Sequence, residues 1–178
     1  MPAATRGASE RPAVDPARFR LLMRRFATGV TVVTCQGLAG PEGTTVNAFT
    51  SVSLRPPRVL VCLDRRSRTL PPILTADRFA VNVLGREQRE LATRLADRTR
   101  TPAQRFAGIR ETTLVTGSPV VPDSLAVIDC LLGQVWPCGD HMLLVGDVVA
   151  GSVGRVDEPL LFYEGGFCTP AISPNSSM

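Results

Sequence analysis

The stretch "TTVNAFTSVSL" (44–54), followed by "RPPRVLVCLDRRSRT" (55–69), decides how this chain is expected to fold. Its first part is a strand rich in β-branched residues that carries polar side chains on both faces, unlike its apolar neighbours. Two prolines interrupt the chain. The run "RVLVCL" (58–63) is then apolar on both faces, as in an interior strand. Strands that follow one another so closely favour antiparallel pairing.

The segments around this pair fit one barrel-like domain. Asp15-Pro16 is a helix-start signal. The stripe Phe19, Leu22, Met23 and Phe26 continues that helix, with Gly29 at its end. Further strands are expected at 30–35, 78–84, 125–136 and 141–153, a helix at 86–98 and a proline-bearing loop that leads to 78–84, and "PLLFYEGGF" (159–167) closes the chain. This order predicts a mainly β, antiparallel barrel with flanking helices. The expected domain runs from 15 to 168, between a disordered tail at 1–14 and a C-terminal tail at 169–178.

The composition excludes several kinds of site. All 20 basic residues of the 178-residue chain are arginine, so a lysine Schiff base and a phosphate-loop lysine are excluded. The single histidine and the five widely spaced cysteines predict no metal site. The sequence shows neither a signal peptide nor an apolar run of membrane-spanning length, so we expect a cytoplasmic protein with reduced thiols.

The turn "DRRSRT" (64–69) concentrates three arginines and two hydroxyls directly after the interior strand. Such a cluster is often only a solvated turn. At the end of a rigid strand, however, guanidinium and hydroxyl donors are suited to hold a phosphate. In that interpretation Asp64 holds the arginines in place, and Ser67 and Thr69 donate hydroxyls.

The only histidine, His141, follows Asp140 in the turn of the expected hairpin. A lone histidine is usually structural or exposed, but it can also orient a substrate amide or relay a proton. Serine hydrolase chemistry with Asp140 lacks a G-x-S-x-G elbow, and a cysteine nucleophile has no supporting motif.

These motifs, taken in order, carry a resemblance to a known family. They are "FATGVTVVT" (26–34), "GTTVNAFTSVSL" with two prolines (43–57), "VLVCLDRRSRT" (59–69), "RFAVNVL" (78–84), "RF" (105–106), a cysteine followed by "GDH" (130–148) and "PLLFYEGGF" (159–167). The chain resembles the short-chain flavin reductases of the FMN-binding split-barrel superfamily, the reductase components of two-component flavin-dependent monooxygenases. The resemblance implies an antiparallel split β-barrel of Greek-key type.

The resemblance also implies roles for individual residues. The turn residues Arg65, Ser67 and Thr69 would grip the phosphate or diphosphate of the flavin, and His141 would lie near the nicotinamide. The complete set of implied cofactor-binding residues is Thr45, Val46, Asn47, Ala48, Thr50, Ser51, Ser53, Asp64, Arg65, Arg66, Ser67, Thr69, Arg105, Phe106 and Tyr163. Arg55 departs from the aspartate that the family often has there, and Arg66 and Arg68 add charge that favours FAD slightly over FMN.

The implied activity is transfer of a hydride from NADH to free FAD or FMN, with reduced flavin passing to a separate monooxygenase. A homodimer is expected, since a second copy would cover open sheet edges. Two alternatives stay open: a split-barrel oxidase that retains FMN, like pyridoxamine-phosphate oxidases, and, more remotely, a basic nucleic-acid-binding module. The sequence leaves open FAD against FMN, NADH against NADPH, and retained against exchanged flavin.

Overall fold

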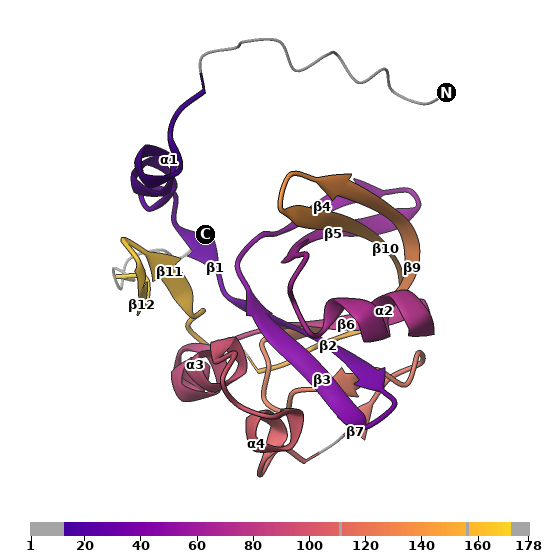
Figure 1. The fold of residues 1–178 in the computed structure, drawn as a ribbon. Helices are drawn as coiled ribbons and strands as arrows, with labels where there is room; N and C mark the ends of the chain where they lie inside the picture. The colour runs from indigo at the N-terminus through magenta and orange to yellow at the C-terminus, as the bar shows by residue number, and fades with distance from the viewer. Residues whose placement is uncertain (1–12, 111, 156, 172–178) are drawn as a thin grey trace.

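A seven-stranded antiparallel sheet forms the body of the protein (Figure 1). The structure, a computed structural model, describes residues 13–110, 112–155 and 157–171. The strands follow the order β3-β2-β6-β9-β10-β5-β4, and each neighbouring pair is antiparallel. Their bounds are β2 Thr31–Gly37, β3 Gly40–Val46, β4 Phe49–Leu54, β5 Pro57–Asp64, β6 Arg78–Val83, β9 Ala126–Cys138 and β10 His141–Val153. The predicted antiparallel split barrel is confirmed.

The two edge strands of this sheet are consecutive in the chain. The expected single strand 44–54 is in fact two strands, β3 and β4, which lie at opposite ends of the strand order and are joined only by Asn47 and Ala48. The Cys62 amide of β5 donates to the Ala48 carbonyl at 3.0 Å. We call Asn47, Ala48 and the facing Cys62 the seam, because the barrel closes here through the chain rather than through a paired strand.

The barrel interior is filled by apolar side chains. A cluster that includes Val33, Val61, Phe79 and Leu144 occupies it, each no more than 1% exposed. Burial of this kind contributes roughly 1.5–3 kcal/mol for each large side chain. A second cluster lies under the helices and includes Val32, Leu84, Leu95 and Leu160. Because β2 separates the two clusters, five successive residues, 31–35, are buried.

Three short helices lie in the connections between the barrel strands. One is α2 (Leu70–Ala76), in the segment predicted to be a loop. That prediction was wrong because Pro71 and Pro72 occupy the first helical positions, where no intrahelical amide is needed. The 3-10 turn η1 (Arg86–Gln88) runs into α3 (Arg89–Ala96), and α4 (Pro102–Phe106) packs near β3.

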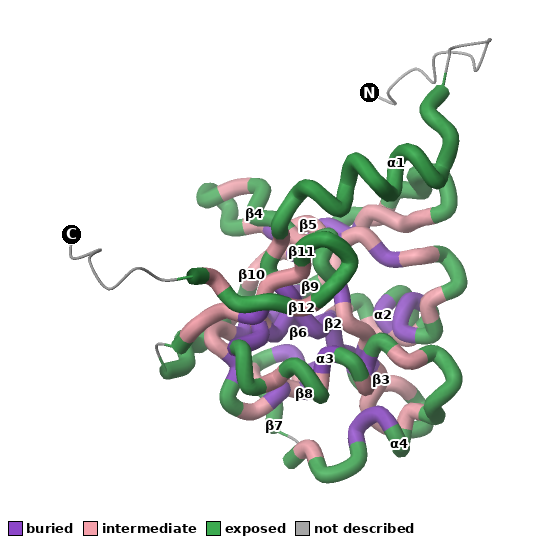
Figure 2. Tube along the Cα trace, turned by 90° about the vertical axis from the view of Figure 1, so that its left-hand side faces the viewer, coloured by how far each residue is buried: buried purple, intermediate pink, exposed green. Residues whose placement is uncertain are grey.

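The N-terminal helix α1 (Pro16–Met23) starts as predicted, with Asp15 accepting hydrogen bonds from the amides of Ala17 and Arg18. It ends at Met23, so Phe26 lies beyond it and Gly29 belongs to β1 (Thr28–Gly29). No residue of α1 is buried, and the helix stands away from the barrel (Figures 1 and 2).

Small strand pairs complete the fold. Strand β1 joins β11 (Leu161–Tyr163) and β12 (Gly166–Cys168) in a three-stranded sheet, and β7 (Thr112–Thr113) pairs with β8 (Pro119–Val120). None of the helices in the described part of the chain is long and apolar enough to cross a membrane.

Candidate functional site

The turn that follows β5 is organised by Asp64. Its carboxylate accepts from the Arg66 amide at 2.8 Å and from the Arg66 guanidinium at 3.1 and 3.3 Å. The Ser67 amide donates to the Asp64 carbonyl at 2.8 Å. The hydrogen bonds from Arg66, followed by one from Arg98, hold the pKa of Asp64 well below its usual range. Asp64 therefore stays ionised and fixes the turn.

The three arginines of the turn differ in their surroundings. Arg66 is bound to Asp64. Arg68 donates to the carbonyl oxygens of Arg98 and Arg100. Arg65 is exposed, its amide donates to the Asp140 carbonyl at 3.0 Å, and no described residue forms an ion pair with its side chain. Arg65 is thus the arginine of the turn whose guanidinium is most available to an anion.

Thr69 lies deeper than the sequence suggested. It is completely buried, and its hydroxyl has no hydrogen-bond partner among the described residues. Its amide approaches the Ser67 hydroxyl at 3.4 Å, and the residue begins α2. A hydroxyl closed to solvent is closed to a phosphate oxygen as well, so Ser67, which lines the cavity described next, is the accessible hydroxyl of the turn.

A cavity of about 160 Å³ lies at the seam and brings distant segments together. Of the predicted site residues it gathers Thr45, Val46, Asn47, Ala48, Asp64, Ser67 and His141. Thr44, Cys62, Leu63 and Arg98 complete its lining. We call this the seam cavity. Its hydroxyl, amide and guanidinium donors suit an anionic, hydrogen-bonding heterocycle such as a phosphorylated flavin.

His141 enters the seam cavity from the first position of β10, directly opposite Asp64 in the strand register. Its Nδ1 lies 2.7 Å from an Asp140 carboxylate oxygen, and the ring is half exposed. This contact lowers the pKa of Asp140, first through the hydrogen bond and then through charge attraction. Asp140 therefore orients the ring, and Nε2 is left for another partner.

The β4 residues of the predicted set lie along the strand beyond the seam cavity. The Thr50 hydroxyl donates to the Ser51 carbonyl at 3.2 Å, and the Ser53 hydroxyl accepts from the Arg55 amide at 3.2 Å. Both contacts are local. None of these three side chains lines the seam cavity.

Arg105 and Phe106 of α4 are buried against β3. Arg105 donates to the Gly43 carbonyl at 2.7 Å and pairs with Glu42 at 3.2 Å. A Cβ at Gly43 would lie 2.9 Å from the Phe106 ring, so only glycine permits this approach. The structure gives both residues a packing role and does not place them in the seam cavity. Tyr163 pairs with Gly166 in the small sheet, and it does not line the cavity either.

Four lining residues lie outside the predicted set: Thr44, Leu63, Cys62 and Arg98. Arg98 comes from the loop after α3 and contacts Asp64 at 2.9 Å. Cys62 lies in an apolar run, where cysteine reads as a small hydrophobe. Burial raises the pKa of the Cys62 thiol. No local spacing in the sequence points to either residue, because each reaches the cavity through the closure of the barrel.

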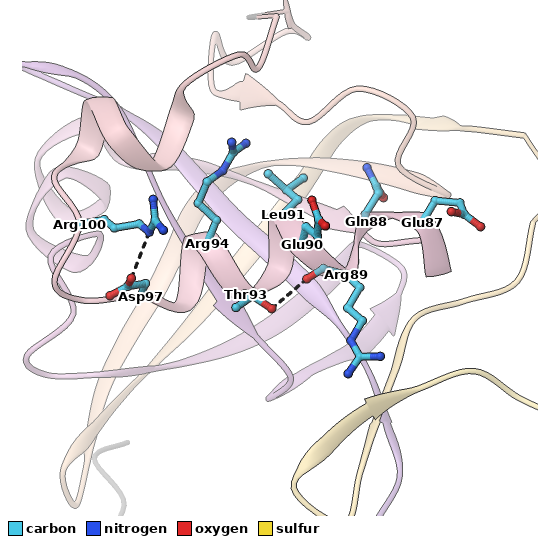
Figure 3. A pocket seen from close by; sticks show the side chains of 9 residues that line it. All are labelled: Glu87, Gln88, Arg89, Glu90, Leu91, Thr93, Arg94, Asp97 and Arg100. Carbon is cyan, nitrogen blue, oxygen red and sulfur yellow. Dashed lines mark hydrogen bonds and ion pairs between the residues drawn. The ribbon is translucent and has the colours of Figure 1, made fainter.

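A cavity of about 730 Å³, larger than the seam cavity, lies elsewhere, along α3 (Figure 3). Its wall contains an Arg100–Asp97 ion pair at 3.0 Å and a Thr93 hydroxyl that donates to the Arg89 carbonyl at 3.0 Å. None of the predicted site residues lines it. Size alone therefore does not mark the site, and the convergence of separate segments at the seam is the better guide. No cluster of three metal-ligating side chains occurs within the residues placed by the structure.

Comparison with known proteins gives consistent matches. The model of the flavin reductase like domain matches residues 23–171. The reductase subunit of a flavin-dependent monooxygenase from Rhodococcus jostii (strain RHA1) is 41% identical over 159 residues, which cover 89% of this chain and 80% of that protein. A flavin reductase from Pseudomonas putida is 39% identical, covering 88% and 91%.

Among solved structures, the NADH:FAD oxidoreductase of Streptomyces globisporus C-1027, in complex with NAD and FAD fragments, superposes with a TM-score of 0.82. It is 31% identical to this chain, and the match covers 94% of this chain and all of the other.

Proposed function

This chain belongs to the flavin reductase like domain family, and from that membership we propose that it transfers hydride from NADH to exchangeable FAD. It is a flavin reductase by family. The choice of NADH and FAD rests on the S. globisporus relative, whose name specifies both. Reduced flavin would then pass to a separate monooxygenase, in keeping with the reductase subunit from R. jostii.

The observation that carries the proposal is the seam cavity. It joins the polar strand end at 44–48, the turn residues Asp64 and Ser67, and His141 around one cavity, with Arg65 exposed on the same turn. A flavin needs these three kinds of contact: a surface along its ring system, donors for its phosphate and a group beside the incoming nicotinamide. The residues that line the cavity support the proposal on each of these points.

The residues of the chain bind and orient. When bound, the nicotinamide and the flavin supply the hydride chemistry themselves, and the protein supplies their alignment. Arg65 and Ser67 would hold the phosphate, and the backbone of 45–48 would lie along the ring system. His141, oriented by Asp140, would hold the nicotinamide carboxamide with Nε2. No side chain is required to move a proton in this scheme.

The test is NADH oxidation by the purified protein with added FAD, FMN and riboflavin. We expect oxidation only with added flavin, faster with NADH than with NADPH. If the protein instead purifies with tightly held FMN and oxidises NADH poorly, the retained-FMN oxidase alternative is favoured. Absence of flavin-dependent oxidation at every flavin concentration would overturn the proposal.

We also propose that the protein is a homodimer. Helix α1 exposes Phe19, Leu22 and Met23, each about half exposed, and buries nothing on its own subunit (Figure 2). Trp136, Leu131 and Val149 are exposed on β9 and β10. A second copy is the occupant we propose for these apolar surfaces, and it would protect the edge strand β4 as well.

A further inference from the structure

Arg98 approaches the seam cavity from a loop that no binding motif marks. Its guanidinium donates to the Asp64 carboxylate at 2.9 Å and lines the cavity beside Ser67 and His141. The side chain is 62% exposed, whereas that of Asp64 is 16% exposed. Arg98 thus presents its remaining donors to whatever occupies the cavity.

The loop that carries Arg98 is held without it. The Asp97 carboxylate accepts from the Thr99 amide and hydroxyl at 2.9 and 2.6 Å. Its ion pair with Arg100 at 3.0 Å is exposed and adds little to this hold. Arg68, from the turn after β5, donates to the carbonyls of Arg98 and Arg100. These contacts fix the loop backbone, so the Arg98 side chain is not needed to hold the loop. An exposed ion pair would in any case add little stability.

The charge around Asp64 is unbalanced. One carboxylate is shared by two guanidinium groups, those of Arg66 and Arg98, and Arg65 beside it has no ion pair with a described residue. With Asp140 counted as well, three guanidinium groups stand against two carboxylates, so an excess of positive charge lies near the point where Asp64 and Arg98 line the cavity. That excess matches a phosphate, which accepts several hydrogen bonds from arginine donors.

We propose that Arg98 is a specificity-determining residue that selects phosphorylated flavins over riboflavin, acting from the loop after α3 together with the turn after β5. The inference rests on the proposed function, because it assigns a residue to the same flavin site. Asp64 keeps the guanidinium in place before the ligand binds, so little side-chain freedom is lost on binding. Arg68 links the two phosphate-binding segments through the loop carbonyls.

The experiment measures flavin dissociation constants by equilibrium fluorescence titration in the absence of NADH. The ligands are FAD, FMN and riboflavin, and the proteins are wild type, Arg98→Ala, Arg98→Lys and Arg100→Ala. Arg100 is the matched control, since it forms a similar exposed ion pair in the same loop but lines the other cavity. Thermal melting of each variant verifies that it is folded.

We expect Arg98→Ala to raise the dissociation constants of FMN and FAD about 5- to 20-fold and that of riboflavin less than about 2-fold. Arg98→Lys should raise the dissociation constants of FMN and FAD by a smaller factor, and Arg100→Ala should bind all three flavins like wild type. Equal weakening of FMN and FAD would assign Arg98 to the phosphate next to the ribityl chain. Weakening of FAD alone would assign it to the second phosphate. Both results support phosphate recognition.

An unchanged FMN and FAD affinity in Arg98→Ala, or an equal loss for riboflavin, would overturn the inference. The proposed function is tested separately by NADH oxidation. If wild type oxidises NADH with added flavin while Arg98→Ala binds both FMN and FAD like wild type, only the inference is refuted. If Arg98→Ala weakens FMN or FAD but not riboflavin, and the wild-type protein does not oxidise NADH with any flavin, only the proposed flavin reductase function is refuted.

Discussion

Arg65 and Ser67 present the most accessible donors of the turn after β5, because Arg66 is bound to Asp64 and Thr69 is buried. Arg65→Ala combined with Ser67→Ala should therefore raise the KM for FAD and FMN about 10-fold or more. Riboflavin has no phosphate, so its turnover should stay near that of wild type. Steady-state NADH oxidation with the three flavins measures this, and Arg89→Ala on α3 is the control. A parallel fall in riboflavin turnover would show that the turn only supports the fold.

His141→Ala should lower kcat/KM for NADH about 5- to 150-fold, the effect of losing one or two hydrogen bonds to the nicotinamide. Flavin affinity should be nearly unchanged. Asp140→Ala should cause a smaller loss in the same direction, because Asp140 contacts the ring at Nδ1 and only orients it. Kinetics at varied NADH, with flavin titrations alongside, separate the two effects. A matching loss of flavin affinity in His141→Ala would place the ring against the flavin instead.

At the residue scale, the sequence predicted what depends on local chemistry. The Asp64–Arg66 pair is expected because both residues lie in one tight turn, and the structure contains it. Arg98 was not predictable, because it meets Asp64 only once 33 intervening residues have folded. The burial of Thr69 was missed for a related reason. Thr69 is buried at the start of α2, and the prolines of that segment had led to the prediction of a loop.

Strand β10 contains a glycine that the packing requires. A Cβ at Gly146 would lie 2.6 Å from the Phe79 ring and 2.9 Å from the Cβ of Cys130. Both neighbours are completely buried. Gly146→Ala should therefore destabilise the protein by about 1–3 kcal/mol, the usual cost of overpacking a core.

Thermal or urea unfolding measures the loss in Gly146→Ala. Gly29→Ala is the matched control, because no atom lies within 4 Å of the Cβ it would add. Equal melting temperatures for the two variants would mean that the barrel relaxes around the extra methyl group.

At the element scale, strongly patterned segments were predicted well. The strand 78–84 and the hairpin of β9 and β10 are present where alternation and a glycine-containing turn indicated them. The interval 44–54 was misread as one strand because its polar pattern continues across Asn47 and Ala48. The two strands are told apart only by the order of strands in the sheet, in which β3 and β4 lie at opposite ends. The apolar stripe of α1 suggested a packed helix, yet no residue of α1 is buried within its own subunit.

For the whole molecule, the exposed stripe leads to a test of assembly. Light scattering should give twice the 19.1 kDa chain mass at micromolar concentration. Phe19→Asp with Leu22→Asp should shift the protein toward monomer, since two charges would face the apolar surface of the partner. The barrel should keep its circular dichroism spectrum, because α1 buries nothing on its own subunit.

An exposed control on the same helix is Ala17→Asp, which adds a charge on the face opposite the apolar stripe. It should leave the mass at the dimer value. A wild-type protein that scatters as a monomer at micromolar concentration would contradict the homodimer.

The position of the seam cavity has a consequence for kinetics. The lumen of the barrel is filled by side chains such as Phe79, Val61 and Leu144, so no ligand is enclosed by the strands. The cavity lies instead where β3 passes into β4, at the one place where the sheet does not pair its ends. A molecule held there can dissociate without breaking any strand pairing. Its residence time is then limited by a few polar contacts rather than by opening of the fold. Such a position is compatible with a flavin that leaves after every turnover, as proposed above.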